Sequence, residues 1–143
     1  MYTGLLHLHS VLRWAVLVFL LIVIVKSFLG WFGNKEYSNG DRKLSLVAVS
    51  ATHLQVIIGF ILYFVSPIVA AALDDMGAAM KNADFRYWAV EHISVMLIAT
   101  VLITIGSAKA KRAAEAVSKF KTQAIWFTIG LILILSRIPW DRL

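Results

Sequence analysis

Cysteine is absent from this chain of 143 residues, proline occurs only twice, and there are only eight acidic residues. The lack of cysteine excludes disulfides, iron–sulfur clusters and thiolate metal sites. The shortage of proline and charge leaves long apolar segments uninterrupted, and 60% of the residues are hydrophobic. Soluble domains average about 45–50% apolar residues. The composition therefore predicts a membrane protein, and the length fits one domain.

Four apolar segments are long enough to cross a bilayer, which takes about 20 residues per helix. They cover residues 5–32, 44–72, 87–107 and 120–140. Pro67 is expected to end or kink the second helix, and Asn39-Gly40-Asp41 before it is typical of a turn. We therefore predict an all-α fold: an integral membrane four-helix bundle formed by a single transmembrane domain, residues 1–143.

The basic residues are unevenly distributed between the two sides of the predicted bundle. Nine of the 14 Lys and Arg residues, with three of the eight acids, lie in or beside the loops that follow the first and third helices. The other side has five acids and the basic residues Arg13, Lys81, Arg86, Arg137 and Arg142. The positive-inside rule then places the two basic loops in the cytoplasm and both termini outside, an N-out/C-out topology. This topology explains the net charge of +6 and gives no reason to expect a nucleic-acid partner.

All four histidines, His7, His9, His53 and His92, lie in or beside the predicted spans. Ionisable side chains in a membrane segment are costly and usually mark a functional site. Three roles are open for them: ligands of a cofactor, structural hydrogen bonds between helices, and a proton path or quinone contact.

His9 and His92 are predicted to lie at the same depth. The first and third helices run parallel, and each histidine follows the start of its helix by four residues, or about 6 Å. A haem with two histidine ligands needs imidazoles that face each other from different helices, and helix bundles commonly supply such ligands. We therefore predict that His9 and His92 bind the iron of haem b. Met96, one turn below His92, is an alternative axial ligand, although methionine in an apolar helix usually serves packing.

Other charged residues near the same end are candidates for contact with the haem. Arg13 lies one turn beyond His9 on the same face, and Arg137 lies near the outer end of the last helix. Either guanidinium can neutralise a haem propionate, although Arg13 can instead extend toward the lipid headgroups. His7 is about 200° from His9 around the helix and is expected to face away. Glu91 can pair with Arg13, Arg86 or Arg137, or it can serve as a carboxylate at the membrane interface.

His53 is predicted to lie about 14 Å from the inner start of its helix, near the middle of the membrane. This depth makes it a poor ligand for an iron bound by the other two helices. It can contact the macrocycle, hydrogen-bond a quinone together with Gln55, or hydrogen-bond a Ser or Thr on another helix.

Three sequence features together resemble a known family. His9 with Arg13-Trp14 opens the first helix, Leu54-Gln55-Val56-Ile57-Ile58-Gly59 lies in the second, and His92 opens the third. This pattern resembles a haem-binding half of haem A synthase, and the whole chain is similar to small bacterial membrane proteins of the cytochrome b type. The resemblance implies haem ligation by His9 and His92 in a bacterial inner membrane. The paired outer cysteines of the synthase are missing, so the resemblance does not extend to haem modification.

The sequence thus predicts an electron-transfer cytochrome rather than a stand-alone enzyme. Electrons would pass between a quinone and a redox partner or a larger membrane complex. The alternative is a non-enzymatic membrane subunit or assembly factor whose histidines are structural. A transporter that moves protons through His53 and Glu91 is disfavoured, because four short helices without interrupted pairs do not match that architecture.

Overall fold

The computed structural model describes residues 2–140, and Asp141 and Arg142 of the charge count lie outside this range. The secondary structure in this range is helical, without strands: α1 (Tyr2–Phe32), α2 (Asn39–Val65), α3 (Pro67–Asp74), α4 (Met76–Ala79), α5 (Ala83–Arg86), a π-helical turn (Tyr87–Glu91), α6 (His92–Arg112) and α7 (Ala116–Arg137). Four helical stretches are long and apolar enough to cross a membrane: Tyr2–Phe32, Asn39–Val65, Ala83–Arg112 and Ala116–Arg137. The predicted all-α class and the four candidate spans are therefore confirmed.

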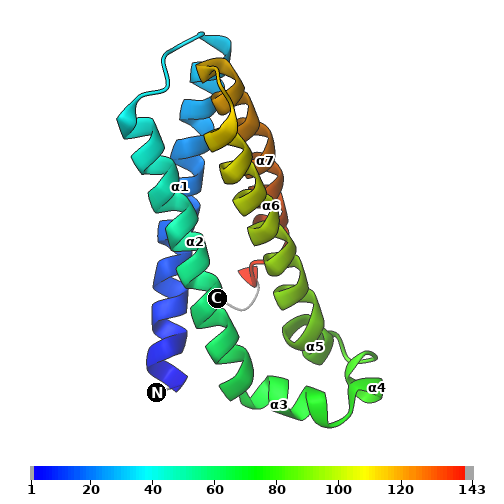
Figure 1. Cartoon of the computed structure of the whole chain (residues 1–143). Coiled ribbons are helices and arrows are strands. Elements are labelled where there is room, and N and C mark those ends of the chain that lie inside the picture. The colour runs from blue at the N-terminus through cyan, green and yellow to red at the C-terminus, as the bar shows by residue number, and fades with distance from the viewer. Residues whose placement is uncertain (1, 141–143) are drawn as a thin grey trace.

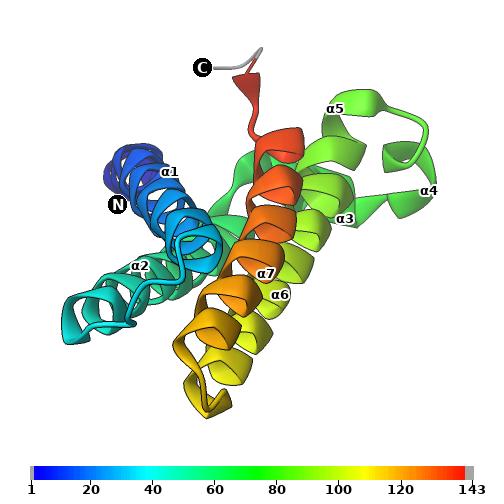
Figure 2. The same cartoon turned by 90° about the horizontal axis from the view of Figure 1, so that it is seen from above.

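The four long helices form an antiparallel bundle in which α1 packs against α2 and α7, and α6 packs closely against α7 (Figures 1 and 2). Helices α2 and α6 meet less extensively, and α1 and α6 face each other diagonally. The main core consists of apolar side chains from all four helices, including Leu20, Ala48, Ile103 and Phe127. The least closed seam of the bundle is thus the one between α2 and α6.

Glycine allows α6 and α7 to approach each other closely. A Cβ atom added at Gly106 would lie 2.4 Å from Cβ of Trp126, and one added at Gly130 would lie 2.5 Å from Cγ1 of Ile103. Any side chain at either position would therefore force the two helices apart.

The second span begins earlier than predicted, and its first helix ends just before Pro67, as predicted. Asn39-Gly40-Asp41 is not a turn but the first turn of α2, because Ser38 and Asp41 form a capping box. The Ser38 hydroxyl accepts a hydrogen bond from the Asp41 amide, and the Asp41 carboxylate accepts one from the Ser38 amide. The span then breaks before Pro67, which starts the separate helix α3 behind the N-cap residue Ser66. The predicted single helix 44–72 is thus two helices, α2 and α3.

The bundle has two chemically distinct ends. The terminal end is where α1 starts, α7 ends and α3–α5 lie (Figure 1). The basic end is formed by the linkers 33–38 and 113–115 with the adjoining helical turns. At the terminal end, α3–α5 and the π-helical turn pack around the buried residues Ala72, Ala79 and Ala89. This packing extends the third span, predicted as 87–107, back to Ala83.

Candidate cofactor site at the terminal end

His92 is held in one orientation by the end of α7. Its Nδ1 lies 2.9 Å from the backbone carbonyl oxygen of Arg137, and the Tyr87 hydroxyl donates to the same oxygen. This carbonyl is available because the last carbonyls of a helix have no intrahelical partner. Since a carbonyl only accepts, Nδ1 of His92 carries the proton and Nε2 carries the lone pair. This arrangement is typical of a metal-ligating histidine.

The His9 ring packs against α2 at Gly59, which has no side chain. A Cβ atom added at Gly59 would lie 3.3 Å from Cε1 of the His9 ring. Next to this contact, the Gln55 side-chain amide donates a hydrogen bond of 2.8 Å to the His9 backbone carbonyl. Nδ1 of His9 is buried and has no hydrogen-bond partner within residues 2–140. The imidazole is therefore positioned by backbone and packing contacts, with its Nδ1 left unsatisfied.

Contacts along α2 relate the depths of the two histidines. Gly59 contacts His9, and Tyr63, one turn further along α2, donates a hydrogen bond of 2.8 Å to the Ala89 carbonyl. Ala89 precedes His92 by three residues, or about 4.5 Å of helix. Because α2 runs antiparallel to both α1 and α6, these contacts place His9 and His92 within about one helical turn of each other in depth.

Two guanidinium groups accompany the histidines. Arg13 and Arg137 are half-buried, and the Nε atom of each is buried without a hydrogen-bond partner among the described residues. The Arg13 guanidinium lies over the indole of Trp14, 5.0 Å from the ring centroid. Glu91 forms an ion pair with Arg86, whose Nε lies 3.5 Å from a carboxylate oxygen of Glu91. The geometry of this contact does not make a hydrogen bond. Both Arg13 and Arg137 therefore retain polar atoms that a bound anion can satisfy.

The remaining predicted site residues lie apart from this pair. His7 is exposed. His53 is also exposed, and its Nε2 lies 2.8 Å from the hydroxyl of Thr104 on α6. Thr104 donates its only hydroxyl proton to the Thr100 carbonyl, so Nε2 of His53 is the donor in this contact. Of the roles considered for His53, the structure shows the hydrogen bond to a Thr on another helix. Met96 packs against the main core.

Unsatisfied polar atoms concentrate at this end of the bundle. Within the described range, six buried side-chain nitrogen or oxygen atoms have no hydrogen-bond partner. Five of them belong to His9, Arg13, Gln55, Glu91 and Arg137. Each such atom costs about 1–3 kcal/mol unless a partner is supplied. The nitrogen atoms of His9, Arg13 and Arg137 at this end are therefore free to interact with a bound ligand.

These residues fit a haem better than a bare metal ion. Among residues 2–140, no group of three or more His, Cys, Asp or Glu side chains is arranged to hold a metal ion. A haem needs only two axial ligands, because the porphyrin supplies the other four. His9 and His92 can serve as the two ligands, Gly59 gives the His9 ring room against α2, and Arg13 and Arg137 are suitable partners for the propionates.

Sequence reasoning missed several polar contacts. The sequence did not indicate that Tyr87 shares the Arg137 carbonyl with His92. Gln123 was not singled out, although it is 3% exposed and hydrogen-bonded to three other helix or linker residues: Ser27, Tyr37 and Ser45. A glutamine within an apolar span was a usable signal, because polar side chains in membrane helices usually bind one another.

Comparison of the chain with protein-family models, curated proteins and solved structures found no match.

Proposed function

We propose that this protein is a membrane-embedded b-type cytochrome that binds haem b between His9 of α1 and His92 of α6. The observation that carries the proposal is the concentration of buried, unsatisfied polar atoms at the terminal end, around two imidazoles from diagonal helices. His92 supports it further, because the Arg137 carbonyl leaves Nε2 as a free lone pair.

The histidines and arginines of the site would contact different parts of the haem. His92, oriented by Arg137 and Tyr87, would present Nε2 to the iron, and His9 would complete the axial pair. Arg13 and Arg137 would neutralise propionate charge in a setting of low dielectric constant. When bound, haem b supplies a one-electron redox couple. Two protein ligands leave no open coordination position, which favours electron transfer over oxygen chemistry and over a stand-alone enzyme.

The distribution of charge supports an orientation in the membrane. The basic end would face the cytoplasm of a bacterial cell, and the termini would face the periplasm or exterior. The haem would then lie toward the outer side of the inner membrane. Electrons would pass between a quinone in the lipid bilayer and a redox partner or larger membrane complex. His53 faces outward from the bundle, and its protonated Nε2 leaves Nδ1 as an acceptor for a quinol hydroxyl.

A second candidate function is a non-enzymatic membrane subunit or assembly factor. It is favoured by the contact between His53 and Thr104, in which a histidine links α2 and α6 without any cofactor. In this case the other histidines would also serve helix association.

An optical spectrum separates the two functions. The full-length protein, expressed with ample haem and purified, should show b-type bands in its reduced-minus-oxidised spectrum, and their absence would overturn the cytochrome proposal. His9→Ala and His92→Ala should each abolish or shift the bands. His7→Ala, on the same helix but exposed, is the matched control and should leave them unchanged. A normal spectrum in His9→Ala would refute the ligand assignment.

A further inference from the structure

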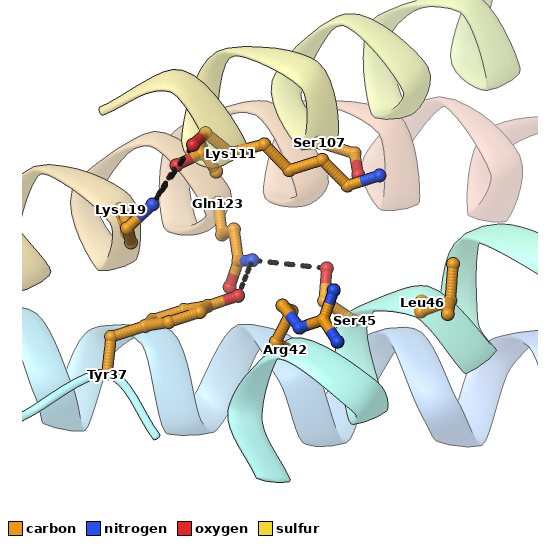
Figure 3. Close-up of a pocket in the computed structure, with 9 residues that line it drawn as sticks. Tyr37, Arg42, Ser45, Leu46, Ser107, Lys111, Lys119 and Gln123 are labelled. Carbon is orange, nitrogen blue, oxygen red and sulfur yellow. Dashed lines mark hydrogen bonds between the residues drawn. The ribbon is translucent and has the colours of Figure 1, made fainter. Parts of the chain in front are cut away.

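A cavity of about 300 Å³ lies at the basic end, between α2 and the α6–α7 pair (Figure 3). Its volume is about ten times that of one water molecule in the liquid. The residues that line it are Tyr37, Arg42, Ser45, Leu46, Ser107, Ala110, Lys111, Lys119 and Gln123. We call this space the basic cavity.

The basic cavity is lined by cations and contains no carboxylate. Lys119 is engaged locally, because its ammonium donates to the carbonyls of Ala110 and Lys111 at the end of α6. Arg42 and Lys111 have charged groups that form no hydrogen bond or ion pair within residues 2–140, and they line the cavity from the neighbouring helices α2 and α6 (Figure 3). The neighbouring carboxylate of Asp41 is already paired with Lys26 at 3.3 Å. The cavity therefore has positive charge without a counter-ion.

A directed hydrogen-bond donor lies at the wall of the cavity. The Gln123 amide nitrogen donates to the Tyr37 phenol at 2.7 Å and to the Ser45 hydroxyl at 3.1 Å. The Tyr37 oxygen thus serves as an acceptor, and its own O–H remains to donate. Burial raises the pKa of Tyr37 above its ordinary value, so the phenol keeps this proton at physiological pH. Gln123 is itself fixed by the Ser27 hydroxyl at 3.1 Å.

The positions of the cations match an amphiphilic ligand better than a free ion. On α2, Leu46 lies one turn deeper in the bundle than Arg42, and it is 51% exposed on the outer surface. On α6, the uncharged Ser107 lies one turn deeper than Lys111. On each helix a cation and an uncharged side chain thus line the cavity one turn apart in the sequence, and the Lys111 side chain extends along α6 toward Ser107 (Figure 3). The cavity also lies at the seam where α2 and α6 meet least.

We propose that the basic cavity binds a phosphate oxyanion, and that its resident ligand is the headgroup of an anionic phospholipid whose acyl chains lie along the α2–α6 seam. Basic pockets between membrane helices on the cytoplasmic side are suited to such headgroups. The lipid would close the least packed seam of the bundle. This site is independent of the haem proposal, because it lies at the opposite end and uses none of the same residues.

The test measures lipid binding to the delipidated full-length protein in a neutral detergent. Native mass spectrometry would compare binding of phosphatidylglycerol with that of phosphatidylcholine. The double variant Arg42→Gln/Lys111→Gln should lose roughly 10- to 30-fold in phosphatidylglycerol affinity, because each cation near the headgroups contributes about a factor of five. The matched control is Lys35→Gln/Lys43→Gln, which removes the same charge from exposed residues at the same end and should change the affinity less than twofold.

Three outcomes would contradict the proposal. Equal phosphatidylglycerol binding by the wild type and both double variants would overturn the site. Phosphatidylcholine binding as tight as phosphatidylglycerol binding would overturn its anion selectivity. Stabilisation by inorganic phosphate alone, lost in Arg42→Gln/Lys111→Gln, would replace the lipid with a free anion. If the double variant does not fold, Tyr37→Phe serves instead and should weaken phosphatidylglycerol binding several-fold.

Discussion

Nδ1 of His92 donates a hydrogen bond of 2.9 Å to the backbone carbonyl of Arg137, which ties the start of α6 to the last turn of α7. The contact uses the main chain of Arg137, so a substitution at this position removes the guanidinium without removing the acceptor. The positioning of His92 and the electrostatic effect of Arg137 can therefore be tested separately.

Arg137→Gln should keep the b-type spectrum but lower the midpoint potential of the bound haem. A nearby cation favours the reduced iron, which carries one positive charge fewer, and its loss should shift the potential by some tens of millivolts. Redox titration followed by absorbance measures the shift. Arg112→Gln, the same change at the exposed basic end, should leave the potential unchanged. A potential that does not move in Arg137→Gln would place the guanidinium away from the haem.

Gly59→Ala should disturb haem binding through His9. The new methyl group would lie 3.3 Å from the His9 ring, tighter than ordinary contact, so the ring must shift by a few tenths of an ångström. We expect reduced haem content or shifted bands, with a loss of stability of about 1–3 kcal/mol. Gly4→Ala on α1 is the control, because a Cβ atom there meets nothing within 4 Å. If Gly59→Ala binds haem with a normal spectrum, the His9 ring does not depend on this contact.

Gln123→Leu should destabilise the basic end of the bundle. The substitution leaves Ser27, Ser45 and Tyr37 without the amide that joins them. Hydrogen bonds between membrane helices contribute about 0.6 kcal/mol each, up to about 1.7, so we expect a loss of about 2–4 kcal/mol. Denaturant unfolding in mixed micelles measures it. Thr122→Val removes only a local bond to the Ser118 carbonyl and should be nearly neutral.

The helical class and the four candidate spans could be predicted because a bilayer demands about 20 apolar residues in each crossing. The helix boundaries were harder to predict. Asn39-Gly40-Asp41 reads as a turn by composition, but Ser38 and Asp41 at the correct spacing form a capping box that starts a helix. This spacing is itself a sequence signal for a helix start, and it outweighs the turn tendency of asparagine and glycine here.

The polar contacts of the candidate site depend on how the helices rotate against each other. Sequence spacing could place His9 and His92 on helices that run parallel, but it could not show that the Arg137 carbonyl meets His92. That contact requires the last turn of α7 to lie beside the π-helical turn before α6. The hydropathy pattern does not determine how α6 and α7 are rotated about their axes. Helix rotation also determines the role of His53, which the sequence left open among three possibilities. The structure shows that His53 contacts Thr104 on α6.

Tyr37 should make the stability of the protein fall at high pH. Burial raises the pKa of this phenol in the folded protein above the value near 10 of an unfolded chain. The folded state therefore binds more protons between those two pKa values, and the contribution of Tyr37 to the free energy of unfolding should be constant below pH ~10 and decrease above it. Denaturant unfolding at a series of pH values measures the slope. Tyr37→Phe removes the titrating group and should flatten the curve in this window, whereas Tyr2→Phe should keep the slope of the wild type. An equally steep decrease in Tyr37→Phe would assign the effect to groups other than Tyr37.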